Sequence, residues 1–181
     1  GAAVGIGALH KYTALLLWPL LWAAADPEER RQTSFLGGVA ITVLLLIPHA
    51  AWLVEHDWQT LRFQAHEGLG LGLDGLGPLR HFGGQALWVT PILALAGWGW
   101  AMRSASGTLN RSVGRGVRFA WWTSAPLWLG FGLASLVGQG EVHWTAPAWL
   151  SCGLGLACSG ARWVRPVYWG SGLGLLLTLM T

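Results

Sequence analysis

The chain has 181 residues, of which 53% are hydrophobic and only 10% are charged, and its formal net charge is +3. Soluble domains carry roughly 25% charged residues, so the composition excludes an ordinary soluble domain and favours a membrane protein. The few basic residues are divided among short connectors, which excludes the clustered basic surface of a nucleic-acid-binding protein.

The apolar runs predict an all-α fold, a polytopic membrane helix bundle in a single transmembrane domain. Three of the runs contain no Asp, Glu, Lys or Arg and reach the roughly 20 apolar residues that cross a bilayer. His10 and Lys11 interrupt the first run, and the last two runs are shorter. We therefore expect five complete spans and a sixth that is incomplete. The predicted spans are residues 1–25, 35–54, 82–102, 119–137, 145–161 and 167–181.

Proline and glycine are frequent inside these spans. Pro19, Pro48, Pro91 and Pro126 lie within them, and neighbouring helices can satisfy the carbonyls that proline leaves free, so we expect kinked helices. Glycine lets membrane helices approach closely, so we interpret the glycines inside the spans as packing residues. The 2 cysteines fall in one predicted helix and fit neither a metal site nor a disulfide framework, so we expect no metal there.

The connectors between the spans differ in charge. Residues 26–34, 103–118 and 162–166 are rich in arginine, whereas residues 55–81 and 138–144 hold most of the histidine and acid. Basic loops stay on the cytoplasmic side, so the first three are predicted inner loops and the other two are predicted outer loops. The titratable groups therefore gather on the outer side, where we expect the chemistry of the protein.

Lys11 lies in the outer half of the first span if this topology holds. A lysine at membrane depth is costly and usually has an anionic partner. One interpretation is that Lys11 binds the phosphate or diphosphate of a lipid. The other is that its long side chain reaches the outer head groups by itself. The sequence leaves both open.

The second connector contains a predicted amphipathic helix at residues 57–67, lying on the membrane surface. Arg62 and His66 are one helical turn apart, so they can present two donors to one phosphate group. The alternative is a metal site, although the spacing matches no zinc signature. Its ligands would be His56, Asp57, His66 and Glu67.

The fourth connector places Glu141 and His143 just before a helix that we expect to start at Thr145. A helix N-terminus favours nearby anions. Glu141 can instead hydrogen-bond a sugar hydroxyl, and a solvated turn is the simpler alternative.

A glycine-rich stretch, GLGLGLDGLG, covers residues 68–77. It lacks the preceding strand and the Lys-Ser/Thr pair of a phosphate-binding loop, so we interpret it as a flexible outer loop.

Four stretches, taken in order, resemble bacterial membrane glycosyltransferases related to the dolichyl-phosphate-mannose protein mannosyltransferases and the lipid A aminoarabinose transferases. They are KYTALLLWP at residues 11–19, HDWQTLRFQAH at 56–66, FGGQALWVTP at 82–91 and EVHWTAPAWL at 141–150. The four stretches span nearly the whole chain, and this order makes the resemblance more specific than any one of them.

The resemblance implies a GT-C fold in the bacterial inner (plasma) membrane. Such enzymes take a sugar from a polyprenyl-phosphate donor and pass it to a lipid, glycan or protein acceptor at the outer face. Lys11 is then expected near the donor phosphate, and the loop with His56, Asp57 and His66 is expected over the active-site cavity. The chemistry agrees, because cations such as Lys11, Arg62 and His66 can neutralise the charge that develops on a departing phosphate. No cofactor is expected.

One departure from the family concerns the catalytic carboxylate, which the family carries in its first outer loop. No stretch of this chain corresponds to that loop, the last span is short, and the first residue is Gly1. We therefore expect a middle piece of a longer enzyme, with its catalytic carboxylate upstream of Gly1. The alternatives are a transporter module, which the uncharged span interiors disfavour, and a non-catalytic membrane scaffold subunit.

Overall fold

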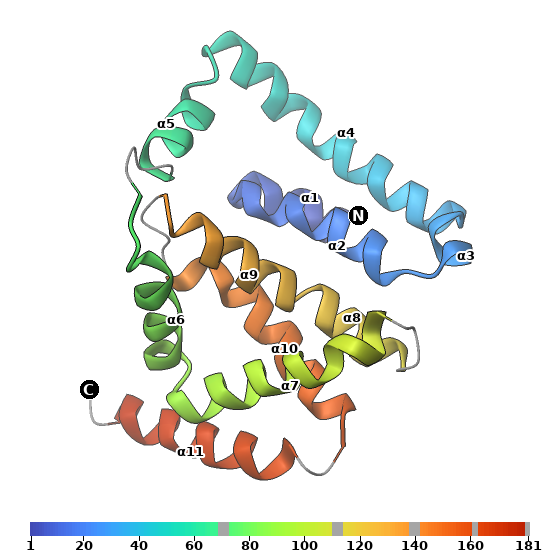
Figure 1. Ribbon diagram of the computed structural model, residues 1–181. Coiled ribbons are helices and arrows are strands. Elements are labelled where there is room, and N and C mark those ends of the chain that lie inside the picture. The colour runs from blue at the N-terminus through green and yellow to red at the C-terminus, as the bar shows by residue number, and fades with distance from the viewer. Residues whose placement is uncertain (69–72, 110–113, 138–141, 161–162, 180–181) are drawn as a thin grey trace. The chain divides into compact units, whose positions relative to one another are not determined.

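The regular structure of the chain is helical, as the sequence predicts. The structure, a computed structural model, describes residues 1–68, 73–109, 114–137, 142–160 and 163–179, and every regular element in these ranges is an α-helix or a 3-10 helix (Figure 1). The chain divides into two compact units, Gly1–Leu69 and Gly70–Thr181, so that the predicted single domain is represented by two separately packed parts.

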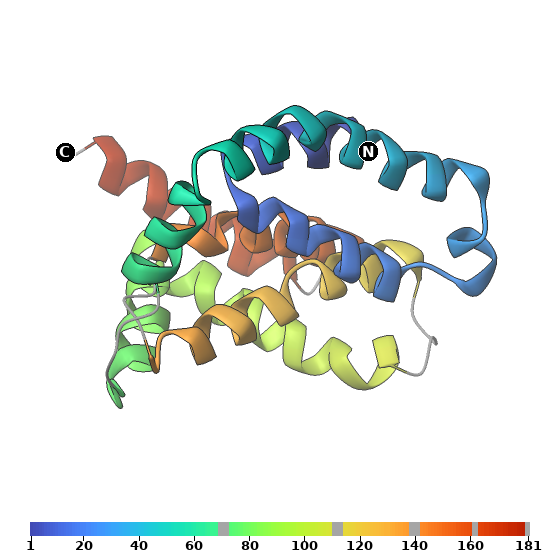
Figure 2. The ribbon, with the colours of Figure 1, turned by 90° about the horizontal axis from the view of Figure 1, so that it is seen from above.

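The first unit consists of a folded-back helical segment packed against one long helix. Its elements are α1 (Ala2–His10), η1 (Tyr12–Leu16), α2 (Leu17–Ala24), α3 (Pro27–Arg30), α4 (Thr33–Glu55) and α5 (Gln59–Gly68). Gly5 of α1 lies against Thr42 and Leu45 of α4, where a Cβ would stand 2.8 Å from Leu45 Cδ1. From α2, Trp18 donates through Nε1 to Thr42 Oγ1 at 3.2 Å. Helix α1 therefore lies along α4 (Figure 2), whereas α2 reaches α4 through Trp18.

The helix α4 corresponds to the second predicted span, residues 35–54, and confirms that this run is one continuous helix. It has 23 residues with a mean hydropathy of 1.9, and 11% of its most apolar window is buried. By length and composition, α4 is long and apolar enough to cross a membrane, and no other helix of the described residues passes the same test. Pro48 lies inside this helix without ending it.

The second unit packs its helices as neighbouring pairs. Its elements are α6 (Gly77–Trp88), α7 (Pro91–Leu109), α8 (Arg115–Trp122), α9 (Ala125–Ala134), η2 (Val142–Thr145), α10 (Ala146–Cys158) and α11 (Val164–Leu179). The helix α10 packs against α8 and α7, and α7 also packs against α6 and α11. These contacts make α7 and α10 the centre of the unit.

Trp100 of α7 occupies the buried centre of the second unit. Its side chain is 0% exposed, and its Nε1 donates to Ser159 Oγ at 2.7 Å. Gly155 of α10 makes room for the indole, because a Cβ there would lie well inside van der Waals contact with the Trp100 ring. This is the close helix approach that the glycines of the spans predict.

The structure divides three of the predicted spans, and this is a correction to their expected continuity. The run 1–25 is broken at Lys11, 82–102 at Val89–Thr90, and 119–137 at Thr123–Ser124. The runs 145–161 and 167–181 correspond to α10 and α11, and α11 begins inside the predicted inner loop 162–166.

The break before α7 has a local cause. Thr90 has a positive φ of 74°, which a β-branched residue adopts at a cost, and Pro91 after it disfavours a helical conformation at Thr90. The Thr90 hydroxyl donates to Gly170 O at 3.3 Å, so a contact with α11 holds the conformation.

The break before α9 is held by hydroxyl groups. Thr123 Oγ1 donates to Phe119 O at 2.8 Å, and Ser124 Oγ donates to Ala120 O at 2.6 Å. Phe119 O also accepts the backbone N–H of Thr123, and Ala120 O is one of the last carbonyls of α8, which a helix end leaves without an intrahelical partner. Pro126 then stands in the first turn of α9, where a proline is well tolerated.

The break at Lys11 has no proline beside it, and tertiary contacts hold it. Gly1 lies against Gly38 and Gly5 lies against Leu45, so α1 runs along α4 in the same direction. After Lys11 the chain reverses, and Trp18 is again beside Thr42. The first run is therefore a helical hairpin rather than one continuous helix.

Candidate functional site

Lys11 stands at the reversal between α1 and η1. Its backbone is extended, with φ −151° and ψ 120°. Its N–H donates to Gly7 O at 2.7 Å, and its carbonyl accepts from Ala14 N at 3.0 Å. The side chain is half-buried. The hairpin thus holds the backbone of Lys11 on both sides and presents its ammonium group at a turn instead of inside a straight helix.

The residue after Lys11 joins this turn to α4. The Tyr12 hydroxyl hydrogen-bonds His49 Nε2 at 2.8 Å, across 37 residues of sequence. On α4, the rings of His49 and Trp52 lie 6.0 Å apart, and those of Trp52 and His56 are stacked at 4.2 Å. His56 Nδ1 also lies 2.8 Å from Trp52 O, to which it donates. We call Tyr12, His49, Trp52 and His56 the aromatic row.

The aromatic row brings two predicted parts of the site into one arrangement. It begins beside Lys11 and ends at His56, so the first and second stretches of the family resemblance are connected through side-chain contacts. His56 was predicted, whereas His49 and Trp52 were missed. Their spacing with His56 along one helix face was the available signal, since residues three and seven positions apart share a face.

Asp57 has a structural role at the end of α4. It follows the C-cap His56 and has a positive φ of 51°, which aspartate tolerates better than most residues. The next residue, Trp58, donates its N–H to Leu53 O at 2.8 Å, which is the bond of a Schellman-type helix end. Asp57 therefore stops α4 and turns the chain into α5.

The remaining predicted residues of the first unit lie on α5. The Arg62 side chain is exposed and takes no part in the contacts of the aromatic row. His66 and Glu67 belong to α5, but their side chains lie outside the described residues. Among the residues that the structure does describe, no group of three His, Cys, Asp or Glu side chains is arranged to hold a metal ion.

In the second unit, the third and fourth stretches of the resemblance meet directly. Trp149 Nε1 of α10 donates to Gln85 Oε1 of α6 at 3.0 Å. The helix α6 also packs against η2, and Trp144 of η2 contacts Phe131 with ring centroids 5.7 Å apart. His143 is exposed on η2, whereas Glu141 lies outside the described residues.

Gln85 lies in an aromatic environment that the sequence did not reveal. Gln85 is 0% exposed and His81, one turn earlier on α6, is 1% exposed. The Trp149 ring contacts two further tryptophans, Trp98 at 6.0 Å and Trp128 at 4.6 Å between ring centroids. We call Gln85, Trp98, Trp128 and Trp149 the Trp149 cluster.

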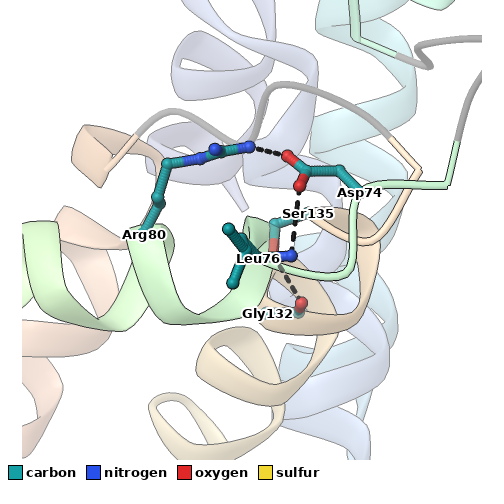
Figure 3. Close-up of polar contacts among 5 residues, drawn as sticks. All are labelled: Asp74, Leu76, Arg80, Gly132 and Ser135. Atoms are coloured by element: carbon teal, nitrogen blue, oxygen red, sulfur yellow. Dashed lines mark hydrogen bonds and ion pairs between the residues drawn. The ribbon is translucent and has the colours of Figure 1, made fainter.

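The second half of the glycine-rich stretch is held in place, which corrects its interpretation as a flexible loop. Figure 3 shows Asp74 paired with Arg80 and accepting the N–H of Leu76 at 3.1 Å. Asp74 N in turn donates to Leu136 O at 2.7 Å. Gly77 packs so tightly on Ser135 O that any side chain would clash. Residues 73–77 are therefore fixed against the end of α9, whereas residues 69–72 lie outside the described residues.

No protein-family model, curated protein or solved structure matches this chain.

Proposed function

We propose that the chain is part of an integral-membrane glycosyltransferase of GT-C type, which transfers a sugar from a polyprenyl-phosphate donor to an acceptor at the outer membrane face. The observation that carries the proposal is that the four stretches that resemble this family are connected in pairs. The first connects to the second through the aromatic row, and the third meets the fourth at Gln85 and Trp149. Within each unit, two stretches that serve the same function are expected to be connected in this way.

The proposal includes a polytopic arrangement with five to six spans in the bacterial inner membrane. The length and exposure of α4 support it, because large apolar side chains cover its surface and need an apolar environment. Those that are exposed include Leu36, Ile41, Val43, Leu44, Ile47 and Val54. The broken runs are compatible with spanning, since membrane proteins tolerate discontinuous helices where neighbouring helices cover the freed backbone groups.

Lys11 would act on the leaving group of the reaction. Sugar transfer leaves negative charge on the polyprenyl phosphate, and a fixed cation stabilises that charge in the transition state. Lys11 is the only lysine of the chain, and its backbone is held at a turn beside the aromatic row. Arg62 and His66 remain proposed as additional donors to the phosphate. The acceptor hydroxyl needs a carboxylate base, proposed to lie upstream of Gly1.

Substitution of Lys11 in the complete enzyme tests the proposal. Lys11→Ala should lower turnover or donor affinity at least tenfold, about 1.4 kcal/mol of lost phosphate stabilisation. Lys11→Arg should restore part of the activity, because the charge is kept while the geometry changes. The control is Arg103→Ala, which removes an exposed cation from a predicted inner loop. Steady-state transfer from a polyprenyl-phosphate sugar is the measurement, and equal rates for Lys11→Ala and the control would overturn the proposed role.

A further inference from the structure

The Gln85 side chain is held in one orientation by Trp149. An indole Nε1 is only a donor, so the group that it contacts on Gln85 must be the amide oxygen. The amide nitrogen, Nε2, is then directed away from Trp149. Nε2 is buried and has no hydrogen-bond partner within the described residues. A fully buried amide thus keeps two N–H groups available in a fixed direction.

Two more hydrogen-bond donors of the Trp149 cluster are also buried without an acceptor. Trp98 Nε1 and Trp128 Nε1 are buried, and neither has an acceptor among the described residues. Both rings contact Trp149, whose own N–H is used by Gln85. Gly97 provides the space for this arrangement, because a Cβ there would stand 2.7 Å from Trp149 Cζ3. Three uncharged donors are therefore grouped around one indole.

Such donors are costly if nothing accepts from them. Burying a donor atom without a partner is unfavourable, so three such donor atoms together are costly unless a ligand or ordered water supplies acceptors. The donors are an amide and two indoles, which carry no charge to neutralise an anion. Burial of an anion without a charged partner is unfavourable, so the expected acceptor atoms are neutral.

We propose that the Trp149 cluster binds the sugar group of a glycoside, with Gln85 Nε2 and the indole N–H groups donating to its hydroxyl oxygens. Sugars combine many neutral acceptor oxygens with C–H faces that pack on aromatic rings, and the cluster offers the complementary groups. Trp98 and Trp149 are half-buried, whereas Gln85 and Trp128 are buried, so parts of the first two side chains are exposed while the donor atoms lie inside the cluster. The choice of a sugar as the ligand rests on the proposed function.

The test measures sugar binding by the 181-residue chain in lipid nanodiscs. The probes are the methyl glycosides of mannose, glucose, galactose, N-acetylglucosamine and arabinose, and binding is followed by saturation-transfer NMR. Gln85→Met keeps the size of the side chain and removes the amide donors. The matched control is Gln32→Met, which changes an exposed glutamine in the first unit. Thermal unfolding of each variant shows whether it is folded.

At least one glycoside should give saturation transfer with the wild-type chain, and Gln85→Met should reduce it at least fivefold while Gln32→Met leaves it unchanged. Gln85→Met also removes the acceptor of Trp149 Nε1, which could destabilise the fold. The double variant Gln85→Met/Trp149→Phe removes both partners of this bond, so it should be folded and should bind glycosides as weakly as Gln85→Met. Signals no greater than those of empty nanodiscs, or signals that folded Gln85→Met retains, would overturn the proposal and assign the donors to ordered water.

The sugar site and the proposed enzyme can fail separately. If glycosides bind but the complete enzyme transfers no sugar from polyprenyl-phosphate donors, the glycosyltransferase proposal fails while the sugar site remains. If transfer occurs and Gln85→Met changes neither kcat nor KM for the donor, the site is wrong while the enzyme proposal remains.

Discussion

Tyr12 connects the turn at Lys11 to α4 through a single hydroxyl group. Among the residues that the structure describes, the bond to His49 Nε2, at 2.8 Å, is the one contact that depends on that oxygen. Tyr12→Phe removes the bond and keeps the ring. We expect the free energy of unfolding to fall by about 0.5–1.5 kcal/mol, the usual net value of such a bond.

Tyr168 provides a matched control, because it is the second tyrosine of the chain and is 75% exposed. Tyr168→Phe should change the free energy of unfolding by less than about 0.5 kcal/mol. Chemical unfolding of both variants in the same detergent micelles makes the comparison. Equal effects at the two positions would mean that the hydroxyl of Tyr12 does not hold the turn to α4.

At the level of single residues, the sequence drew attention to charged and titratable groups and not to neutral ones. Lys11 and His56 were identified because a charge or an imidazole in an apolar chain is conspicuous. Gln85 and Trp149 were not, although both lie in stretches that carry the family resemblance. They are 64 residues apart, and only the packing of α6 against its neighbours shows that one donates to the other. A buried neutral pair gives no signal in composition or spacing.

At the level of elements, most prolines stand where helices begin, which corrects the kinks that were expected at Pro91 and Pro126. Apart from Pro48, each of the 8 prolines stands within the first three residues of a helix. In that first turn the missing N–H breaks no helical hydrogen bond. A proline inside an apolar run can therefore mark a boundary, as Pro91 and Pro126 do. The break at Lys11 could not be predicted in this way, because contacts of Tyr12 and Trp18 with α4 determine it.

Arg30 stabilises the C-terminal end of α2 from the following helix. Its Nε donates to Ala25 O at 3.1 Å and its Nη2 to Ala23 O at 3.5 Å. The guanidinium also lies over the Trp22 ring, 4.0 Å from the centroid. These carbonyls are the ones that a helix end leaves without partners, and a cation is favourable beside them.

Replacement of Arg30 should therefore destabilise the first unit. We expect Arg30→Ala to lower the free energy of unfolding by about 1–2 kcal/mol, below the full value of charged hydrogen bonds because the site is partly exposed. Arg31→Ala, at an exposed neighbour, should cost less than about 0.5 kcal/mol. Arg30→Lys should recover only part of the loss, since a single ammonium cannot reproduce both donors. Equal stability of the Arg30→Ala and Arg31→Ala proteins would show that the cap contributes nothing.

At the level of the whole molecule, the sequence predicted the helical class and the long apolar helix α4, but not the division into two units. Hydropathy measures how apolar a run is and is insensitive to whether the run continues straight. The run 1–25 is as long as a span, yet the chain turns back at Lys11, so that α1 packs along α4 and α2 reaches α4 through Trp18. The proposed membrane topology therefore depends first on α4, whose two ends carry connectors of different charge.

The orientation of α4 can be tested by labelling its flanking connectors. Glu28 precedes α4 in the arginine-bearing connector, and Gln59 follows it at the start of α5, and both are exposed. In a variant with both native cysteines replaced by alanine, Glu28→Cys and Gln59→Cys should react with a membrane-impermeant maleimide from opposite sides of sealed vesicles. Gln59→Cys should react from the outer side, because the positive-inside rule assigns the arginine-bearing connector to the cytoplasm.

Solubilised protein provides the control, since both cysteines should then react at the same rate. Reaction of both from one side of intact vesicles would mean that α4 lies along the membrane surface or re-enters it, despite its 23 residues. That result would also contradict the predicted location of His56 on the outer side, and with it the proposed position of the donor phosphate. A third outcome is that Glu28→Cys reacts from the outer side and Gln59→Cys from the cytoplasmic side. The helix α4 would then still span the membrane, but the aromatic row would lie at the cytoplasmic face.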